Sequence, residues 1–318
     1  MRAGALTIAV IGVLGAALTL SACATGGTPD AKITPRTQVN NPALATLPDV
    51  PVLRDRTYTT DTGIPQKLDV CTPPDDVTAD GTGPYPAIIE VHGGSWARGD
   101  KADLGYRAIC QWLASAGYVT FNLDYRVAPQ DPYPAGFDDV RAAVEWLRRP
   151  AQVARYDIDP DRVGAFGGSA GGNLVSLLGT TGSGSWTTGS RVAAVVEMSG
   201  PADLTGANVN PDFLPDQLAY LHCTTEGDCP AARKASPVFQ VDRTDPPFFI
   251  THSSDESKIP IAQSKEFVAR LRKAGVDTTF VVVQGRAHSI AMMNDDLKNR
   301  IVAFYQRTLG AKPVGVLN

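Results

Sequence analysis

This sequence has few histidines, a small net charge and few clustered basic residues, and each shortage excludes a class of protein. The 318 residues include 29 Lys and Arg against 33 Asp and Glu, which gives a formal net charge of −4. Because a nucleic-acid backbone is held by a clustered basic face, we expect no nucleic-acid partner. None of the four histidines is spaced with the cysteines as a zinc site requires, so we expect no metal centre.

A long apolar run is confined to the N-terminus. Residues 5–20 are almost wholly apolar and follow Arg2, which is typical of an export signal. The stretch LSAC, ending at Cys23, resembles a bacterial lipobox. That resemblance implies cleavage before Cys23, lipid on its sulfur and new amino terminus, and anchoring to the outer face of the cell membrane. A plain signal peptide or an uncleaved anchor helix stays open as an alternative.

The segment after the apolar run is rich in Thr, Pro, Asn and Ala and has no helical periodicity. We expect a signal peptide at 1–22, a flexible tether at 23–50 and a globular domain at 51–318. With 43% hydrophobic and 19% charged residues, the chain has ordinary globular composition and ample length for a large core.

Only four cysteines follow the proposed lipidation point. An exported domain can keep disulfides, and an even number permits full pairing. The short polar loop CTTEGDC predicts a Cys223–Cys229 bond, which leaves Cys71 and Cys110 as the second pair. Other pairings stay open.

Strand and helix patterns alternate along the rest of the chain. The predicted strands lie at 54–60, 66–72, 85–94, 118–126, 162–168, 192–200, 246–253 and 278–285. The predicted helices lie at 104–117, 135–149, 170–179, 261–275 and 297–309. This alternation predicts an α/β fold, with a mostly parallel sheet of about eight strands, helices on both faces and antiparallel strands at the front.

The segment 201–241, after the sixth predicted strand, interrupts the alternation. It contains both loop cysteines, several prolines and little periodicity. Ligand crevices form at the carboxyl ends of parallel strands. We therefore predict a small insertion that serves as a lid or cap, while a long surface loop pinned by a disulfide fits equally well.

Five glycines surround one serine in RVGAFGGSAGGN, directly after a short apolar run. The residues Gly167-Gly168-Ser169-Ala170-Gly171 fit the pattern G-x-S-x-G between a strand and a helix. In that context the serine occupies a tight turn that exposes its hydroxyl as a nucleophile. A purely structural glycine turn is the less favoured interpretation.

A serine nucleophile requires a base, and the chain has four histidines. His288 follows the last predicted strand, so it lies where the order serine, acid, histidine requires the base. We expect His92 to shape the glycine loop that follows it. His222 lies in the insertion, and His252 ends a predicted strand; we expect structural roles for both.

The segment HGGSW follows the third predicted strand. A glycine-rich loop at this place is expected to supply backbone N–H groups to an oxyanion. His92 and Gly93 begin the loop. The expected donors are Gly94 and Ser95, with a third from Ala170, the residue after the nucleophile.

Taken together, these segments resemble an α/β-hydrolase from about residue 54 to residue 309. They are similar to the esterase branch of hormone-sensitive-lipase-like enzymes and of arylformamidase-like or feruloyl-esterase-like enzymes with HGGxW. The usual third glycine of the lipase-type HGGG is Ser95 here, which favours the HGGxW side. The matching segments are HGGSW, DYRVAPQDPYPAGFDDVRAAVEWLR, DPDRVGAFGGSAGGN, PPFFITHSSDESKIPIAQS and GRAHS.

The acid of the expected triad has two candidates. Relatives read H-G-x-x-D-x-x-V-P at the segment HSSDESKIP. Without a gap between His252 and Pro260, the acid falls on Glu256; Asp255 requires a shift of one residue. We prefer Glu256 and keep Asp255 open, since Asp and Glu both serve in such triads.

These residues predict a serine hydrolase that cleaves carboxylic esters, with short to medium acyl chains, through an acyl-enzyme and without metal or organic cofactor. The expected partners are a small ester substrate and, through the lipid anchor, the membrane. An amidase or peptidase on the same triad is one alternative, and a non-catalytic surface-binding lipoprotein is another. The sequence gives no indication of oligomeric state.

Overall fold

The computed structural model describes residues 1, 41–59, 63, 65–74, 83–206 and 210–310. The predicted signal peptide, Cys23 and most of the predicted tether fall outside the described residues. Within the described ranges, no helix combines the length and the apolar character needed to cross a bilayer.

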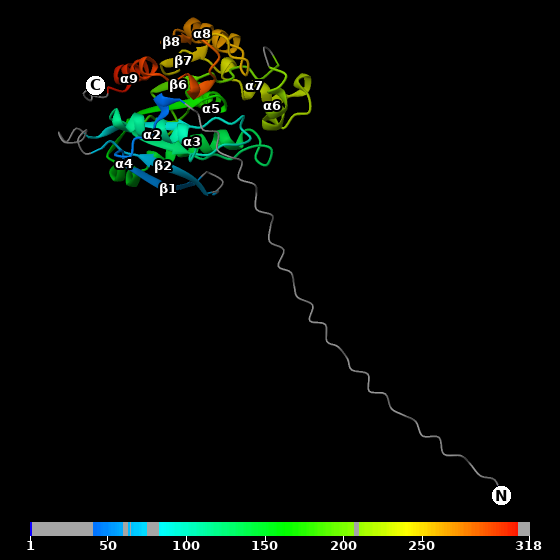
Figure 1. Cartoon of the computed structure of the whole chain (residues 1–318), viewed down its shortest axis with the longest axis horizontal. Helices are drawn as coiled ribbons and strands as arrows, with labels where there is room; N and C mark the ends of the chain where they lie inside the picture. Colours follow the sequence, from blue (N-terminus) through cyan, green and yellow to red (C-terminus); the bar gives the residue numbers. More distant parts are fainter. Residues whose placement is uncertain (2–40, 60–62, 64, 75–82, 207–209, 311–318) are drawn as a thin grey trace. The chain divides into compact units, whose positions relative to one another are not determined.

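An eight-stranded sheet forms the centre of the domain (Figure 1). Its strands follow the order β1-β2-β4-β3-β5-β6-β7-β8. All pairs from β4 onward in that order are parallel, while β1 and β2 are antiparallel at one edge. The strands are β1 (Val52–Thr59), β2 (Pro65–Cys71), β3 (Tyr85–Val91), β4 (Val119–Leu123), β5 (Ile158–Gly168), β6 (Ala194–Met198), β7 (Phe248–Ser253) and β8 (Thr278–Val283).

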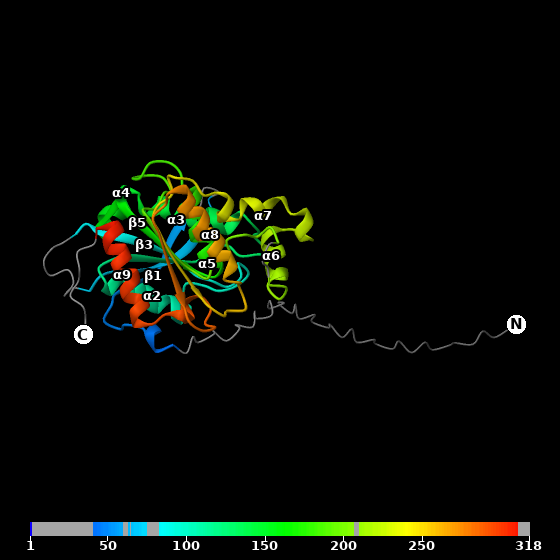
Figure 2. The same cartoon turned by 90° about the horizontal axis from the view of Figure 1, so that it is seen from above.

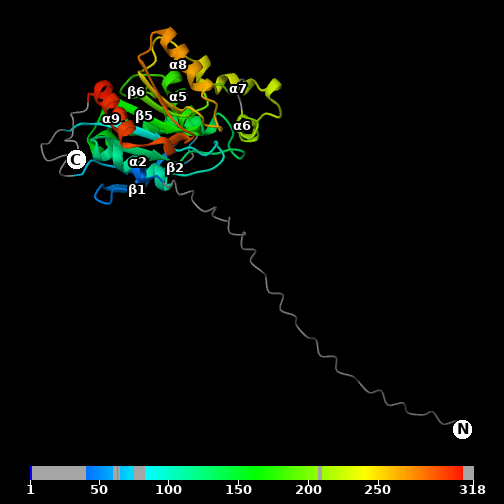
Figure 3. The same cartoon turned by 45° about the horizontal axis from the view of Figure 1, so that its top comes forward.

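Helices cover both faces of the sheet, as the views in Figures 2 and 3 show. One apolar cluster packs α2 and α9 against one face, and another packs α3, α5 and α8 against the opposite face. Every residue of β4, β6 and β7 is buried, which explains why these strands read as continuous apolar runs. The helices are α2 (Leu104–Ser115), α3 (Ala135–Leu147), α4 (Pro150–Tyr156), α5 (Ala170–Thr181), α8 (Ala262–Ala274) and α9 (Asp295–Leu309).

The segment between β6 and β7 is more ordered than its sequence pattern indicated. It forms α6 (Leu214–Leu221), α7 (Pro230–Lys234) and the 3-10 turns η2 (Glu226–Asp228) and η3 (Pro237–Phe239). In Figures 1, 2 and 3, α6 and α7 lie together at the end of the sheet away from α9. Two further 3-10 turns are η1 (Pro42–Leu44) and η4 (Ser289–Met292).

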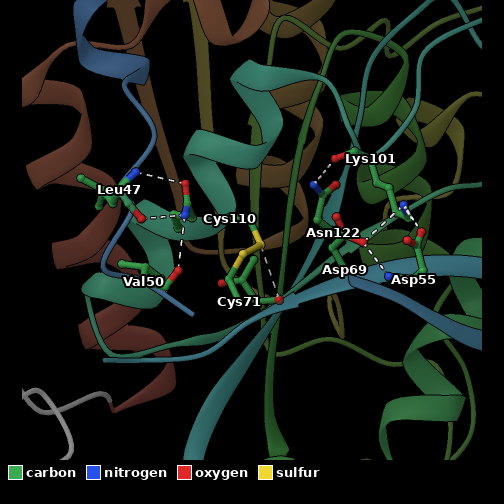
Figure 4. Close-up of a disulfide and its surroundings, with 10 residues drawn as sticks. Leu47, Val50, Asp55, Asp69, Cys71, Lys101, Cys110 and Asn122 are labelled. Carbon is green, nitrogen blue, oxygen red and sulfur yellow. Dashed lines mark hydrogen bonds and ion pairs between the residues drawn. A yellow bond between two sulfur atoms is a disulfide. The ribbon is translucent and has the colours of Figure 1, made fainter. Parts of the chain in front are cut away.

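The expectation of a flexible tether as far as residue 50 is wrong for residues 41–50. Leu44 and Val50 are buried against the domain. The Gln111 side chain of α2 donates to the Leu47 carbonyl at 2.6 Å and accepts the Leu47 N–H at 3.0 Å (Figure 4). The segment is ordered because its apolar side chains and its backbone both find partners on the domain surface.

Both predicted disulfides are confirmed. Cys71 at the end of β2 bonds to Cys110 in α2, which ties the antiparallel edge of the sheet to its covering helix (Figure 4). Cys223 bonds to Cys229 and closes the loop between α6 and α7. The first bond is fully buried, whereas the second is half-exposed.

Candidate active site

The serine turn connects β5 to α5 through a strained backbone. Ser169 has φ 56° and ψ −124°, a backbone conformation that residues other than glycine rarely adopt. A Cβ atom on Gly168 would lie 2.1 Å from Ser289 Oγ, and one on Gly171 would lie 2.1 Å from the Val91 carbonyl oxygen. The glycines are therefore required by close approach, and the turn presents the serine at the carboxyl end of β5.

His288 follows β8 and reaches the serine from a neighbouring loop. Its Nε2 lies 2.8 Å from Ser169 Oγ, and its Nδ1 lies 2.7 Å from Glu256 Oε1. Because Nδ1 faces a carboxylate, that nitrogen carries the proton and Nε2 is left as an acceptor for the serine hydroxyl. The structure thus brings together three side chains from three separate loops.

The Glu256 carboxylate is almost completely buried, with 1% of its side chain exposed. Its Oε1 also accepts the Ile259 N–H at 2.9 Å. Burial by itself would raise the pKa of Glu256. The hydrogen bond and charge of His288, together with the nearby Ser199 hydroxyl and His252, outweigh burial and hold the pKa below its ordinary value.

Asp255, the other acid that the sequence left open, is exposed, and the ring nitrogens of His288 pair with Glu256 and Ser169 instead. Its carboxylate accepts the Ser254 hydroxyl at 2.6 Å, and its N–H donates to the Gly285 carbonyl at 2.9 Å. The second contact joins the loop after β7 to the loop after β8. Of the two candidates, the structure places Glu256 at the histidine.

The HGGSW loop lies directly against the serine turn. A Cβ atom on Gly93 would be 3.2 Å from Ser169 Cβ. Among the described residues, no acceptor pairs with the N–H groups of Gly94 and Ser95. Ala170 is the first residue of α5, so its N–H has no partner within the helix. These three N–H groups are free to face a negatively charged oxygen.

Tyr106 in α2 is a supporting residue that the sequence analysis missed. Its hydroxyl accepts the Gly93 N–H at 2.7 Å and donates to the Gly168 carbonyl at 3.3 Å. Burial raises the pKa of this phenol, so the hydroxyl keeps its proton. The residue ties the HGGSW loop to the serine turn. The one signal in the sequence was a tyrosine on an apolar helix face, whose buried hydroxyl requires a partner.

His92 and His222 lie away from the serine. The buried His92 ring stacks on Tyr125 with centroids 4.3 Å apart, and its Nδ1 lies 2.7 Å from the Gly93 carbonyl oxygen. Burial lowers the pKa of His92. His92, the first residue of the HGGSW loop, is thus buried against Tyr125, while His222 is exposed at the end of α6.

The insertion packs onto the HGGSW loop through aromatic rings. The fully buried Trp96 ring stacks on Tyr220 of α6, with centroids 4.3 Å apart and planes 5° apart. Phe213 lies on the same indole at 5.6 Å, and Arg98 pairs with Asp216 at 3.2 Å. Helix α6 therefore supports the loop that carries the free N–H groups.

Comparison with known proteins places this geometry in context. The model of the BD-FAE family matches residues 68–271. The chain is 33% identical to esterase LipC of Mycobacterium tuberculosis over 229 residues, covering 67% of this chain and 55% of LipC. It is 30% identical to esterase LipQ of the same organism over 244 residues, covering 71% of this chain and 57% of LipQ. The chain thus matches about half the length of these curated relatives.

Solved structures share the architecture. A truncated carbohydrate esterase from gut microbiota superposes with a TM-score of 0.71 at 23% identity, covering 84% of this chain and 100% of that chain. At this identity the likeness concerns the fold alone. The α/β-hydrolase fold predicted from the sequence motifs is confirmed.

Proposed function

The chain belongs to the BD-FAE family, and from this premise we propose that it hydrolyses carboxylic esters with Ser169 as the nucleophile. The observation that carries the proposal is the 2.8 Å contact between Ser169 Oγ and His288 Nε2 at a strained strand-to-helix turn. The names of LipC and LipQ, both esterases, support the same reaction.

In the proposed mechanism, His288 Nε2 accepts the Ser169 proton while Oγ attacks the ester carbonyl. The N–H groups of Gly94, Ser95 and Ala170 stabilise the oxyanion of the tetrahedral intermediate. His288 then gives its proton to the departing alcohol. A water molecule that His288 deprotonates releases the acid from the acyl-enzyme. Glu256 holds the imidazole in the required tautomer and stabilises its cation.

The proposal extends to the substrate and to the insertion. We propose esters with short to medium acyl chains, and α6 as part of a cap at the mouth of the site. The support for a cap is the packing of α6 on the HGGSW loop through Tyr220 and Trp96. Rates on p-nitrophenyl esters of increasing acyl length test the range. A steady rise towards long chains would contradict it.

The decisive test of ester hydrolysis is Ser169→Ala. We expect the rate of p-nitrophenol release from p-nitrophenyl acetate to fall to the rate in solvent plus a small remaining activity that comes from substrate binding. The substitution removes no core volume, so the melting temperature should change little. A fluorophosphonate probe should label the wild type and leave the variant unlabelled. Near-wild-type turnover by the folded variant would refute the role of Ser169.

The same assay distinguishes ester hydrolysis from amide hydrolysis. Anilides and short peptides with the matching acyl group should react far more slowly than the esters. Equal or faster cleavage of the amide would make the chain an amidase or peptidase on the same three residues. Failure of the probe to label folded wild-type protein would favour a non-catalytic binding role.

We also propose that the chain is exported as a lipoprotein, acylated at Cys23 and anchored to the membrane. Two disulfides support an oxidising compartment, because such bonds are rare where thiols are kept reduced. Expression of wild type and Cys23→Ala in a bacterium, followed by detergent-phase partition, tests this. Wild type should enter the detergent phase and the variant should not; identical partition would contradict acylation.

A further inference from the structure

A second histidine lies behind the acid, on the side opposite His288. His252 is the penultimate residue of β7, and its side chain is fully buried. Its Nε2 lies 2.8 Å from the Ile259 carbonyl oxygen and 3.5 Å from Glu256 Oε2. Its Nδ1 lies 2.8 Å from Ser264 Oγ in α8. The proposed mechanism uses none of these contacts.

The partners of His252 fix the position of its proton. Nε2 faces a carbonyl oxygen and a carboxylate, both acceptors, so Nε2 must carry a hydrogen. Burial lowers the pKa of His252, which favours the neutral ring. Nδ1 of a neutral ring is then an acceptor, and the Ser264 hydroxyl donates to it. The ring is a fixed neutral donor pointing at the acid loop.

The two oxygens of Glu256 have different surroundings. Oε1 accepts from His288 and from the Ile259 N–H. Oε2 is buried and has no hydrogen-bond partner among the described residues; His252 Nε2 lies 3.5 Å from it, and the Ser199 hydroxyl is also near the carboxylate. His252 therefore holds the turn that carries the acid, because Ile259 contacts Glu256 through its N–H and His252 through its carbonyl, and its Nε2–H also faces Oε2.

We propose that His252 is a positioning residue whose Nε2–H holds the Ile259 turn and faces the second oxygen of Glu256, so that the first oxygen stays aimed at His288. The inference rests on the proposed ester hydrolysis. The titratable groups around the carboxylate are His288, His252 and Glu197, the last on β6. Loss of the Nε2–H removes a donor that faces the Glu256 charge, so His288 compensates more of that charge, which favours the imidazolium.

The test uses two substitutions of different chemistry. In His252→Gln the amide nitrogen takes the place of Nε2 and keeps a donor, whereas His252→Leu removes it. For His252→Leu we expect kcat to fall about tenfold, because the turn that positions Glu256 loses its hydrogen bond to His252, with KM nearly unchanged. The acid limb of the kcat/KM profile should move to higher pH by about half a unit. His252→Gln should retain both properties within about twofold of wild type.

His222→Asn is the control for the loss of a histidine. His222 is exposed, and its backbone has a left-handed conformation that Asn tolerates. This variant should match wild type in kcat and in the acid limb. Melting temperatures of all variants are measured in parallel. If folded His252→Leu and His252→Gln share one pH profile and one kcat, His252 merely packs and the proposal fails.

A measurement on the wild type decides the matter without turnover and without a variant. In protein with ¹⁵N-labelled histidine, the His252 signals should show a protonated Nε2 and a bare Nδ1 from about pH 5 to about pH 9. A proton on Nδ1, or a ring that becomes cationic in that range, would overturn the proposal. If wild type cleaves no ester, the proposed function fails, and the tautomer still tests the Nε2–H donor on which this inference depends.

Discussion

Glu256 is the residue on which most contacts of the site converge. His288 and the Ile259 N–H contact its carboxylate, and with the nearby Ser199 hydroxyl and His252 they hold its pKa below the ordinary value although it is buried. A buried charge is tolerated only when it is paired and hydrogen-bonded. The position of the acid is therefore as tightly defined as that of the nucleophile.

Neutralising this acid should affect the chemical step most. We expect Glu256→Gln to lower kcat by about a thousandfold or more, because the imidazole loses the partner that sets its tautomer and stabilises its cation. Asp255→Asn is the matched control and should stay within about twofold of wild type, since the exposed Asp255 carboxylate pairs with the Ser254 hydroxyl rather than with His288. Steady-state kinetics on p-nitrophenyl acetate give both values. A severe loss of kcat confined to Asp255→Asn would show that Asp255, and not Glu256, is the acid that supports His288.

Glu197 predicts a pH-dependent stability. Burial raises its pKa to about 8, although the Gly200 N–H donates to its carboxylate. The folded state thus keeps a proton that the unfolded chain has released, and stability falls as pH rises from the ordinary glutamate pKa towards 8. Gln cannot ionise and can still accept from Gly200. Glu197→Gln should therefore gain more than about 1 kcal/mol over wild type at high pH.

Urea unfolding of both proteins at pH 5 and at pH 8.5 checks this linkage. The two unfolding free energies should be similar at the lower pH and should separate at the higher one. A constant difference between the proteins across the range would show that Glu197 titrates normally.

Sequence reasoning succeeded for residues defined by local pattern. Ser169 stands in a glycine turn that close backbone approach demands, and His288 occupies the expected place after the last strand. The supporting residues Tyr106 and His252 could not be predicted from the sequence, because their roles depend on contacts between distant segments. Tyr106 meets Gly168 across 62 residues, and only the folded β7–α8 junction places His252 against the acid.

At the scale of elements, α6 and the HGGSW loop form one packed unit. Ser95 and Trp96 both have φ 56°, a conformation that costs about 1–3 kcal/mol per residue and persists only under support from its surroundings. The stack of Trp96 on Tyr220 supplies part of that support. The sequence did not predict this helix, because its short apolar face lies among prolines and loop residues.

Removing the Tyr220 ring should make the HGGSW loop less rigid. For Tyr220→Ala we expect kcat to fall about tenfold or more, approaching the loss of one oxyanion donor. Tyr220→Phe is the control: it keeps the ring, and the Tyr220 hydroxyl has no hydrogen-bond partner among the described residues. Kinetics and melting curves of both variants are compared. Equal kcat values in the two folded proteins would mean that α6 merely covers the site.

At the scale of the whole molecule, the Cys71–Cys110 bond joins the antiparallel edge to the helix layer across 39 residues of sequence. Replacing both cysteines with Ala should cost about 4 kcal/mol, because the unfolded chain regains the entropy of a long loop. The pair Cys223→Ala/Cys229→Ala opens a separation of only 6 residues and should cost less. Urea unfolding midpoints rank the two. A larger loss from the shorter loop would contradict the entropic account.

The sheet order was only partly accessible from sequence. Alternating strands and helices predicted a mostly parallel sheet, but pairing of β3 with both β4 and β5 depends on packing that no local pattern records. The ordered segment 41–50 was missed for a similar reason. Leu44 and Val50 lie in the short stretch NPALATLPDV, which has no helix or strand periodicity, and the core that covers them exists only once α2 and its neighbours are assembled.

The three side chains of the site lie on different loops, and 119 residues separate Ser169 from His288. In the proposed mechanism, a ribosome therefore completes the nucleophile long before the base exists. Until the segment beyond β8 has been synthesised and has folded onto the sheet, the nascent chain contains Ser169 without the proposed base. The order of these segments would thus keep the chain inactive during its own synthesis, and a polypeptide truncated before β8 should hydrolyse no ester.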